Sequence, residues 1–175
     1  VPPIPRVSGP TAEGDWPLSF DQERYWFMEQ LFPDGAGLNI TAVTRMRGPL
    51  VPARVEVALL EIVKRHAAWR TVFPVVDGRP TQRVVAARPV PLPVIDLGGL
   101  PADRREDEAR RVAIAEARRP YDLTGGPLVR TTLLRLSERE HALLIGMHHS
   151  VSDGWSMGIF VREWGALYGA LAAGA

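Results

Sequence analysis

The amino-acid sequence predicts an α/β fold built as a two-layer α/β sandwich, in which helices pack on a sheet. Residues 52–66 carry apolar side chains at helical spacing, whereas residues 38–47 alternate between apolar and polar side chains, as a half-buried strand does. Residues 142–147 form a nearly continuous apolar run, which is typical of a strand buried on both faces. The predicted order is helix, strand, helix, hairpin, helix, strand, strand, helix, and this mixture favours a sandwich over a doubly wound fold.

Composition and charge exclude several functional classes. The 175 residues include 21 basic and 20 acidic side chains, and a net charge of +1 argues against binding to nucleic acid or to an anionic membrane. No stretch reaches the roughly 18 apolar residues that a membrane-spanning helix needs. The lack of cysteine excludes disulfides and thiol chemistry and is compatible with a cytoplasmic protein, which is the location we expect.

The N-terminal part divides into a linker and the start of a domain. Residues 1–17 are rich in Pro and Gly and show no apolar period, so they are interpreted as linker-like, and residues 18–175 as one domain. Ser19 and Gln22 form a capping-box pattern that predicts a helix start. The helix that follows is dense in aromatic residues, for which core packing is the simplest interpretation: Tyr25, Trp26, Phe27 and Phe32.

The middle of the chain is predicted to be structural. The helix over residues 52–66 is expected to pack His66 rather than use it as a ligand. Residues 71–85 are interpreted as a hairpin around Asp77-Gly78. Residues 88–100 form a Pro/Gly-rich connection, and the densely charged residues 102–119 are expected to form a solvated surface helix.

The candidate site follows the apolar strand. If that strand continues through His148 and His149, their side chains point to opposite faces, so that one faces a site and the other supports it. Asp153 and Gly154 then supply a turn, with the carboxylate near the start of the last helix and Gly relieving backbone strain. This pattern favours one imidazole that takes or shares a proton, next to a carboxylate that holds the loop.

Several other interpretations of these residues stay open. Two histidines at a strand end are also common as ordinary polar loop residues. His149 and Asp153 have a ligand-like spacing, but further metal ligands are lacking nearby, so no metal site is predicted. Ser150 and Ser152 lie in no Gly-x-Ser-x-Gly elbow, which disfavours a serine nucleophile.

Two arginines are candidates for a structural salt bridge. Arg65 and Arg70 lie near the end of the helix over residues 52–66, and an arginine held near the core needs a carboxylate partner. Asp153 is a candidate for that partner. The alternative is that both arginines extend to solvent.

The stretch MHHSVSDGWS resembles the HHxxxDG signature of condensation domains of non-ribosomal peptide synthetases, which related acyltransferases such as wax ester synthases share. Three further stretches are similar to that family, in its order: PLSFDQERYWFMEQL, RHAAWRTVF (typically RHExLRTxF) and YDLTGGPLVRTTLLRL. Together they extend from about Pro17 to the C-terminus. Ala67 and Trp69 depart from the usual Glu and Leu of the second motif.

The resemblance implies a fold, a reaction and partners. The chain is similar to the N-terminal lobe only of a two-lobed, chloramphenicol acetyltransferase-like domain, so the C-terminal lobe is an expected partner. Such enzymes join a donor acyl or peptidyl thioester to the amine of an acceptor, each tethered by phosphopantetheine to a carrier protein. Upstream donor and downstream acceptor carrier proteins are therefore expected partners, and no cofactor is expected to bind this lobe.

The resemblance also implies roles for the site residues. His149 would deprotonate or hydrogen-bond the attacking amine, with His148 in support. Asp153 would be structural and paired with an arginine, and Gly154 would let the loop approach closely. Two alternatives remain: a non-catalytic condensation-like module that recruits a partner protein, and an ester-forming acyltransferase of the same superfamily.

Overall fold

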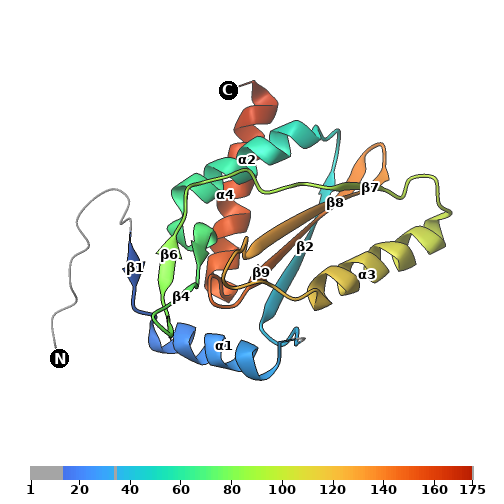
Figure 1. Cartoon of the computed structure of the whole chain (residues 1–175). Helices are drawn as coiled ribbons and strands as arrows, with labels where there is room; N and C mark the ends of the chain where they lie inside the picture. Colours follow the sequence, from blue (N-terminus) through green and yellow to red (C-terminus); the bar gives the residue numbers. More distant parts are fainter. Residues whose placement is uncertain (1–13, 34, 175) are drawn as a thin grey trace.

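A four-stranded sheet forms the centre of the molecule, in the computed structural model that describes residues 14–33 and 35–174 (Figure 1). Its strands lie in the order β2-β9-β8-β7, where β9 is antiparallel to both of its neighbours and β7 is parallel to β8. The bounds are Asn39–Arg47 for β2, Val94–Asp96 for β7, Val129–Ser137 for β8 and Glu140–His148 for β9. The predicted mixed α/β class is confirmed.

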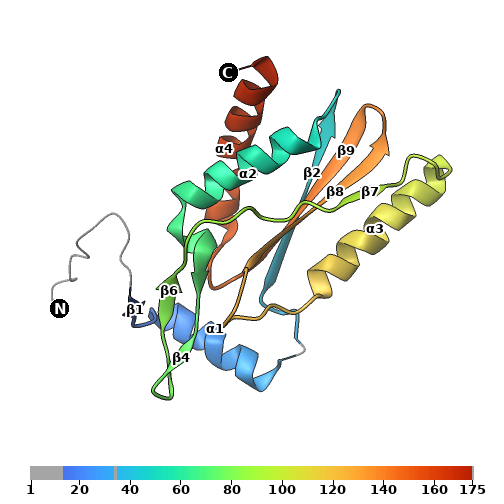
Figure 2. The same cartoon turned by 45° about the horizontal axis from the view of Figure 1, so that its top comes forward.

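Helices cover both faces of this sheet (Figure 2). On one face α2 (Pro52–Arg65) and α4 (Gly154–Ala173) pack against side chains that include Leu143 and Ile145. On the other face α3 (Ala102–Arg118) packs against Ala142 and Leu144. Successive residues of β9 therefore enter opposite cores, which explains why its sequence is apolar throughout. Because of α3, the sheet is the middle layer of three.

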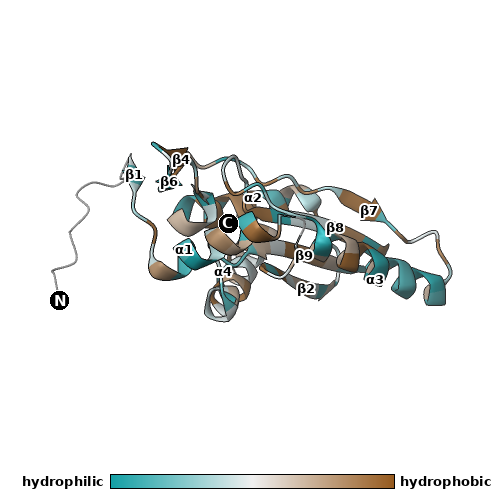
Figure 3. Ribbon diagram, turned by 60° about the horizontal axis from the view of Figure 1, so that its bottom comes forward, coloured by the Kyte–Doolittle hydropathy of each residue, from teal (hydrophilic) through white to brown (hydrophobic). Residues whose placement is uncertain are grey.

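The helix α3 has the amphipathic character that the sequence predicts. Ala109 and Val112 are buried against the sheet, while the outer face is charged and mostly hydrophilic in colour in Figure 3. Salt bridges of this face run between neighbouring turns of the helix, as between Arg111 and Glu108. They are solvent-exposed pairs, so each adds little stability.

A second, smaller sheet lies beside α1. It pairs β1 (Asp15–Trp16) with β6 (Gln82–Val84), and β6 with β3 (Thr71–Val72) after the 3-10 turn η1 (Ala67–Arg70). Residues 1–13 of the predicted linker lie outside the described residues, but Asp15 and Trp16 correct that prediction. They pair antiparallel with β6, and Arg83 of β6 also binds the Asp15 carboxylate through two hydrogen bonds of 2.7 Å.

The predicted hairpin around Asp77-Gly78 is confirmed. The strands β4 (Val75–Val76) and β5 (Arg79–Pro80) pair antiparallel on either side of these two residues. Asp77 and Gly78 have φ values of 50° and 75°, the left-handed conformation that a two-residue hairpin turn requires.

The helix α1 (Phe20–Leu31) begins with the predicted capping box, in which Ser19 and Gln22 exchange two side-chain to backbone hydrogen bonds. No residue of α1 is fully buried. Trp26 packs against a small core, whereas Phe27 and Phe32 are 58% and 60% exposed. Core packing is therefore the wrong interpretation for these two aromatic residues, because Phe27 lies on the outer side of the helix.

Candidate functional site

The end of β9 separates the two histidines. The backbone N–H of His148 donates to the carbonyl of Leu128 at 3.1 Å, and that of His149 donates to the carbonyl of Leu38 at 2.8 Å. Successive residues at the end of β9 are thus hydrogen-bonded to the chain on opposite sides, one next to β8 and the other next to β2. As a result the His148 side chain is fully buried, whereas His149 is only partly buried. The predicted division into one inner and one outer imidazole is present.

Both ring nitrogens of His148 have partners. Nδ1 lies 2.8 Å from the Ser150 hydroxyl and accepts the backbone N–H of Ser150 at 3.2 Å. Nε2 lies 3.2 Å from Oε1 of Glu29 in α1. Burial, with a smaller effect of neighbouring His149, lowers the pKa of His148 from 6.5 to about 4, so the ring is neutral at physiological pH. Burial also raises the pKa of the Glu29 carboxyl.

His149 has a different environment. Its ring packs on that of Tyr25 from α1, with centroids 4.9 Å apart and planes tilted by 33°. Among the described residues, no side chain hydrogen-bonds to this ring. An imidazole in this position has its nitrogens available to hydrogen-bond a substrate.

The predicted pairing of Asp153 with Arg65 or Arg70 is wrong in this structure. Asp153 is the N-cap of α4, and its carboxylate accepts the backbone N–H of Ser156 at 2.8 Å and the Ser156 hydroxyl at 2.6 Å. These hydrogen bonds lower the pKa of Asp153. The Asp153 carboxylate needs no distant cation, because the first turn of α4 supplies a backbone N–H donor three residues along the chain.

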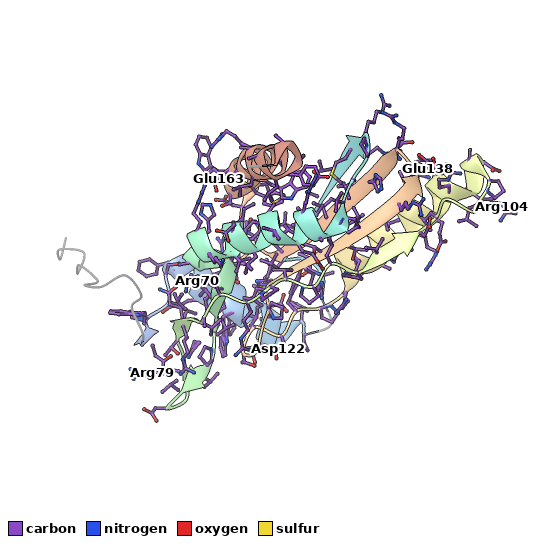
Figure 4. The ribbon with its side chains drawn as sticks, turned by 90° about the horizontal axis from the view of Figure 1, so that it is seen from above. Arg70, Arg79, Arg104, Asp122, Glu138 and Glu163 are labelled. Atoms are coloured by element: carbon purple, nitrogen blue, oxygen red, sulfur yellow. The ribbon has the colours of Figure 1, made fainter. Side chains whose placement is uncertain are left out.

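The two arginines have other partners. Arg65 lies 3.2 Å from the carboxylate of Glu163 in α4, which also lies 2.8 Å from Nε2 of His66. Arg70 donates to the carbonyl of Val85 at 3.0 Å. Figure 4 labels Glu163 on α4 and Arg70 beyond the end of α2. Both arginines therefore stabilise the scaffold around the site rather than the HHxxxDG loop itself.

The other residues of this loop are structural in this arrangement. Gly154 is the first residue of α4, and a Cβ added there would meet no atom within 4 Å, so the expected close approach of the loop is not observed. Ser150 is hydrogen-bonded to His148.

Within residues 14–33 and 35–174, no group of three or more His, Cys, Asp or Glu side chains is arranged to hold a metal ion. No helix of the described chain is long and apolar enough to cross a membrane.

Sequence patterns did not single out Glu29. It follows Gln22, Tyr25 and Trp26 at helical spacing, and these four residues form the partly buried face of α1. A carboxylate on a face otherwise directed inward is a recognisable signal, because a carboxylate is rarely buried without a partner. The partner could not be identified, since His148 lies 119 residues away along the chain.

Comparison with known proteins identifies the family. The family model for the condensation domain matches residues 12–175. The chain belongs to the condensation-domain family. The resemblance carried by MHHSVSDGWS and the three other motifs is therefore confirmed.

The chain is similar to segments of bacterial synthetases. The chain is 48% identical over 158 residues to a linear gramicidin synthase of Brevibacillus parabrevis, covering 90% of the chain and 3% of that protein. It is 40% identical over 173 residues to phosphinothricin tripeptide synthetase PhsC of Streptomyces viridochromogenes, covering 99% of the chain and 16% of that protein. The chain thus spans only a small part of these relatives.

Solved condensation domains share the fold. The starter condensation domain of rhizomide synthetase RzmA matches with a TM-score of 0.87 at 27% identity, over 93% of this chain and 39% of the other. A variant of that domain was solved in complex with C8-CoA and Leu-SNAC. The first condensation domain of the calcium-dependent antibiotic synthetase, in complex with a substrate analogue, matches with a TM-score of 0.82 at 30% identity over the same shares.

Proposed function

We propose that this chain supplies the histidine-bearing wall of a condensation domain that forms an amide bond between two carrier-bound substrates. The observation that carries the proposal is the contrast between the histidines: His148 is buried, neutral and hydrogen-bonded on both nitrogens, while the His149 ring is accessible. The amine of a carrier-bound aminoacyl acceptor attacks the carbonyl of the donor thioester. His149 is the group placed to receive or to hold the proton that this amine loses.

The bond changes balance without a further reactant. The amine nitrogen forms a bond to the thioester carbon, the carbon–sulfur bond breaks, and the leaving thiolate takes up the proton released by the amine. His149 accepts that proton or holds the amine by a hydrogen bond. Both substrates are tethered by phosphopantetheine, so holding the amine next to the carbonyl is a large part of the rate enhancement. Upstream donor and downstream acceptor carrier proteins are the proposed partners.

A second lobe is part of the proposal. The chain covers 39% of the solved condensation-domain chains that it matches, and His149 lies at a partly open surface. We expect the remaining part of the domain to close the substrate tunnel over His149. The isolated 175-residue chain is then expected to be inactive.

The test uses a complete condensation domain that contains this chain, with a loaded donor carrier protein and a loaded acceptor carrier protein. Intact-protein mass spectrometry follows transfer of the donor group to the acceptor carrier. The His149→Ala variant should lose roughly 10²- to 10⁴-fold in rate, the usual contribution of general acid–base catalysis. His66→Gln, which removes a histidine outside the site, is the matched control and should keep most of the rate.

Each outcome decides between the functions. Transfer that His149→Ala leaves unchanged would remove this residue from the reaction. No transfer by the wild-type domain with several matched pairs of substrates would favour a module that only recruits a partner protein. Transfer to a hydroxyl acceptor but not to an amine would favour the ester-forming alternative.

A further inference from the structure

The carboxylate of Glu29 is the most buried acidic group at the candidate site. Its side chain is 10% exposed, and that of its partner His148 is 0% exposed. The two groups come from α1 and from the end of β9, and Nε2 lies 3.2 Å from Oε1. On a helix with no fully buried residue, one carboxylate is thus taken out of water to meet one imidazole. Such burial is costly unless the carboxylate is hydrogen-bonded.

The hydrogen bonds of His148 decide where its proton lies. The backbone N–H of Ser150 points to Nδ1 at 3.2 Å, and a backbone N–H can only donate. Nδ1 must therefore carry a lone pair. In the neutral ring the single proton then resides on Nε2, which faces Glu29. The Ser150 hydroxyl, 2.8 Å from Nδ1, donates in the same sense.

The charged groups around His148 agree with this assignment. Burial lowers the pKa of His148 to about 4, so the imidazole stays neutral beside the Glu29 carboxylate. The Tyr121 ring meets the His148 ring edge-on, with the two ring centroids 6.0 Å apart. The guanidinium of Arg130 lies 3.7 Å from the centre of the Tyr121 ring. His149 is the remaining titratable neighbour, and its charge would also disfavour a cation on His148. Glu29 is the only acceptor that the described residues offer to Nε2.

We infer that Glu29 is a positioning residue: it accepts the Nε2 proton of the tautomer that Ser150 selects, holds the His148 ring in one orientation and thereby fixes the direction in which β9 presents His149. The inference rests on the proposed role of His149. The helix α1 reaches both histidines from the same face, because Tyr25 and Glu29 are one turn apart: Tyr25 packs on His149 and Glu29 binds His148. Glu29 therefore acts on the reaction without touching the substrate.

The test combines spectroscopy with kinetics in a complete condensation domain that contains this chain. Nitrogen NMR of histidine-labelled protein should show the His148 proton on Nε2, protected from exchange with water. Glu29→Ala should increase the exchange rate of that proton at least tenfold. It should also lower kcat by roughly 10- to 100-fold at nearly unchanged KM, because a displaced His149 affects the reaction more than substrate binding.

Two variants separate positioning from folding. Glu29→Gln keeps an acceptor oxygen for the Nε2 proton, so it should keep that proton protected from exchange and restore most of kcat. Glu23→Gln removes an exposed carboxylate of the same helix and should change neither the NMR signal nor the rate. The NMR measurement does not depend on catalysis, so it stands even if the proposed function fails. A proton on Nδ1, or an exchange rate and a kcat that Glu29→Ala leaves unchanged, would overturn the inference.

Discussion

Asp153 stabilises the start of α4 through the two hydrogen bonds that it accepts from Ser156. Replacing it by Ala removes the cap and should lower the free energy of unfolding by about 1 kcal/mol. Asp153→Asn keeps a capping oxygen and should cost less. Because the pKa of Asp153 is lowered in the folded state, the stability that its charge adds is present above the unfolded-state pKa and is lost as the pH falls through the folded-state pKa. Urea unfolding at neutral and acidic pH measures both effects; equal stability of wild type and Asp153→Ala would contradict the capping role.

Buried His148 also makes stability depend on pH. Here the folded state favours the neutral form of the side chain, whereas for Asp153 it favours the charged form. The unfolded chain binds a proton on this histidine near pH 6.5, while the folded chain does so only near pH 4. Between these values the unfolded state holds more protons, so stability falls as the pH falls from about 6.5 to about 4, by up to about 3 kcal/mol. Buried His141, whose pKa is also lowered, adds in the same direction. Denaturant unfolding as a function of pH tests this, and His148→Gln should flatten the curve; an unchanged slope in that variant would assign the effect elsewhere.

Single residues also show where sequence reasoning succeeds and where it fails. The predicted division into one inner and one outer histidine is present, because strand alternation and burial are local properties. The Asp153 salt bridge was wrong, since a local cap replaced a long-range ion pair. Glu29 was missed because its role depends on a partner in β9, and no sequence pattern fixes which helix covers a given strand end.

At the scale of elements, β9 has a glycine where a larger residue would force a neighbouring side chain to move. A Cβ added at Gly146 would lie 2.8 Å from the hydroxyl of Tyr121, and Arg130 lies 3.7 Å from the centre of that aromatic ring. Gly146→Ala should therefore destabilise the protein by about 1–3 kcal/mol through overpacking. The matched control is Gly158→Ala in α4, where no atom lies within 4 Å of the added Cβ. This change should stabilise by roughly 1 kcal/mol through helix propensity.

A double variant identifies the cause of that effect. Tyr121→Phe removes the oxygen that the added methyl group would meet, so it should recover part of the stability lost in Gly146→Ala. Thermal and urea unfolding of the two single variants and the double variant give the coupling energy. Purely additive effects would show that the loss arises in the backbone of β9 and not at the Tyr121 hydroxyl.

Long and periodic elements were predictable from the sequence, and short paired ones were not. The helices α2 and α3 and the strands β8 and β9 carry their own apolar period, so their existence followed from residue order. The short strands β1 and β7 lie in Pro-rich stretches that were interpreted as linker and connection. They become strands only through their partners β6 and β8, which is tertiary information.

At the scale of the whole molecule, the inner face of α1 reaches the histidines while its outer face remains uncovered. Phe20, Phe27 and Leu31 are 93%, 58% and 54% exposed, on the same helix that supplies Tyr25 and Glu29 to the site. Aromatic and leucine side chains in one exposed stretch are characteristic of a surface that has a partner. The site itself is also open, because His149 is only partly buried and the chain covers 39% of the solved condensation-domain chain that it matches.

Partial enclosure leads to a prediction about activity. The proposed function requires that both thioester-tethered substrates are held at His149 and that water is kept away, and one wall of the proposed tunnel achieves neither. The isolated 175-residue chain should therefore fold but transfer no donor group, whereas the complete condensation domain should transfer it. The measurement is the mass-spectrometric transfer assay at equal concentrations, with circular dichroism as the control for folding. If the isolated chain catalysed transfer at a rate close to that of the complete domain, His149 and the residues that α1 places around it would suffice for the reaction, and the second lobe would serve only to bind carrier proteins.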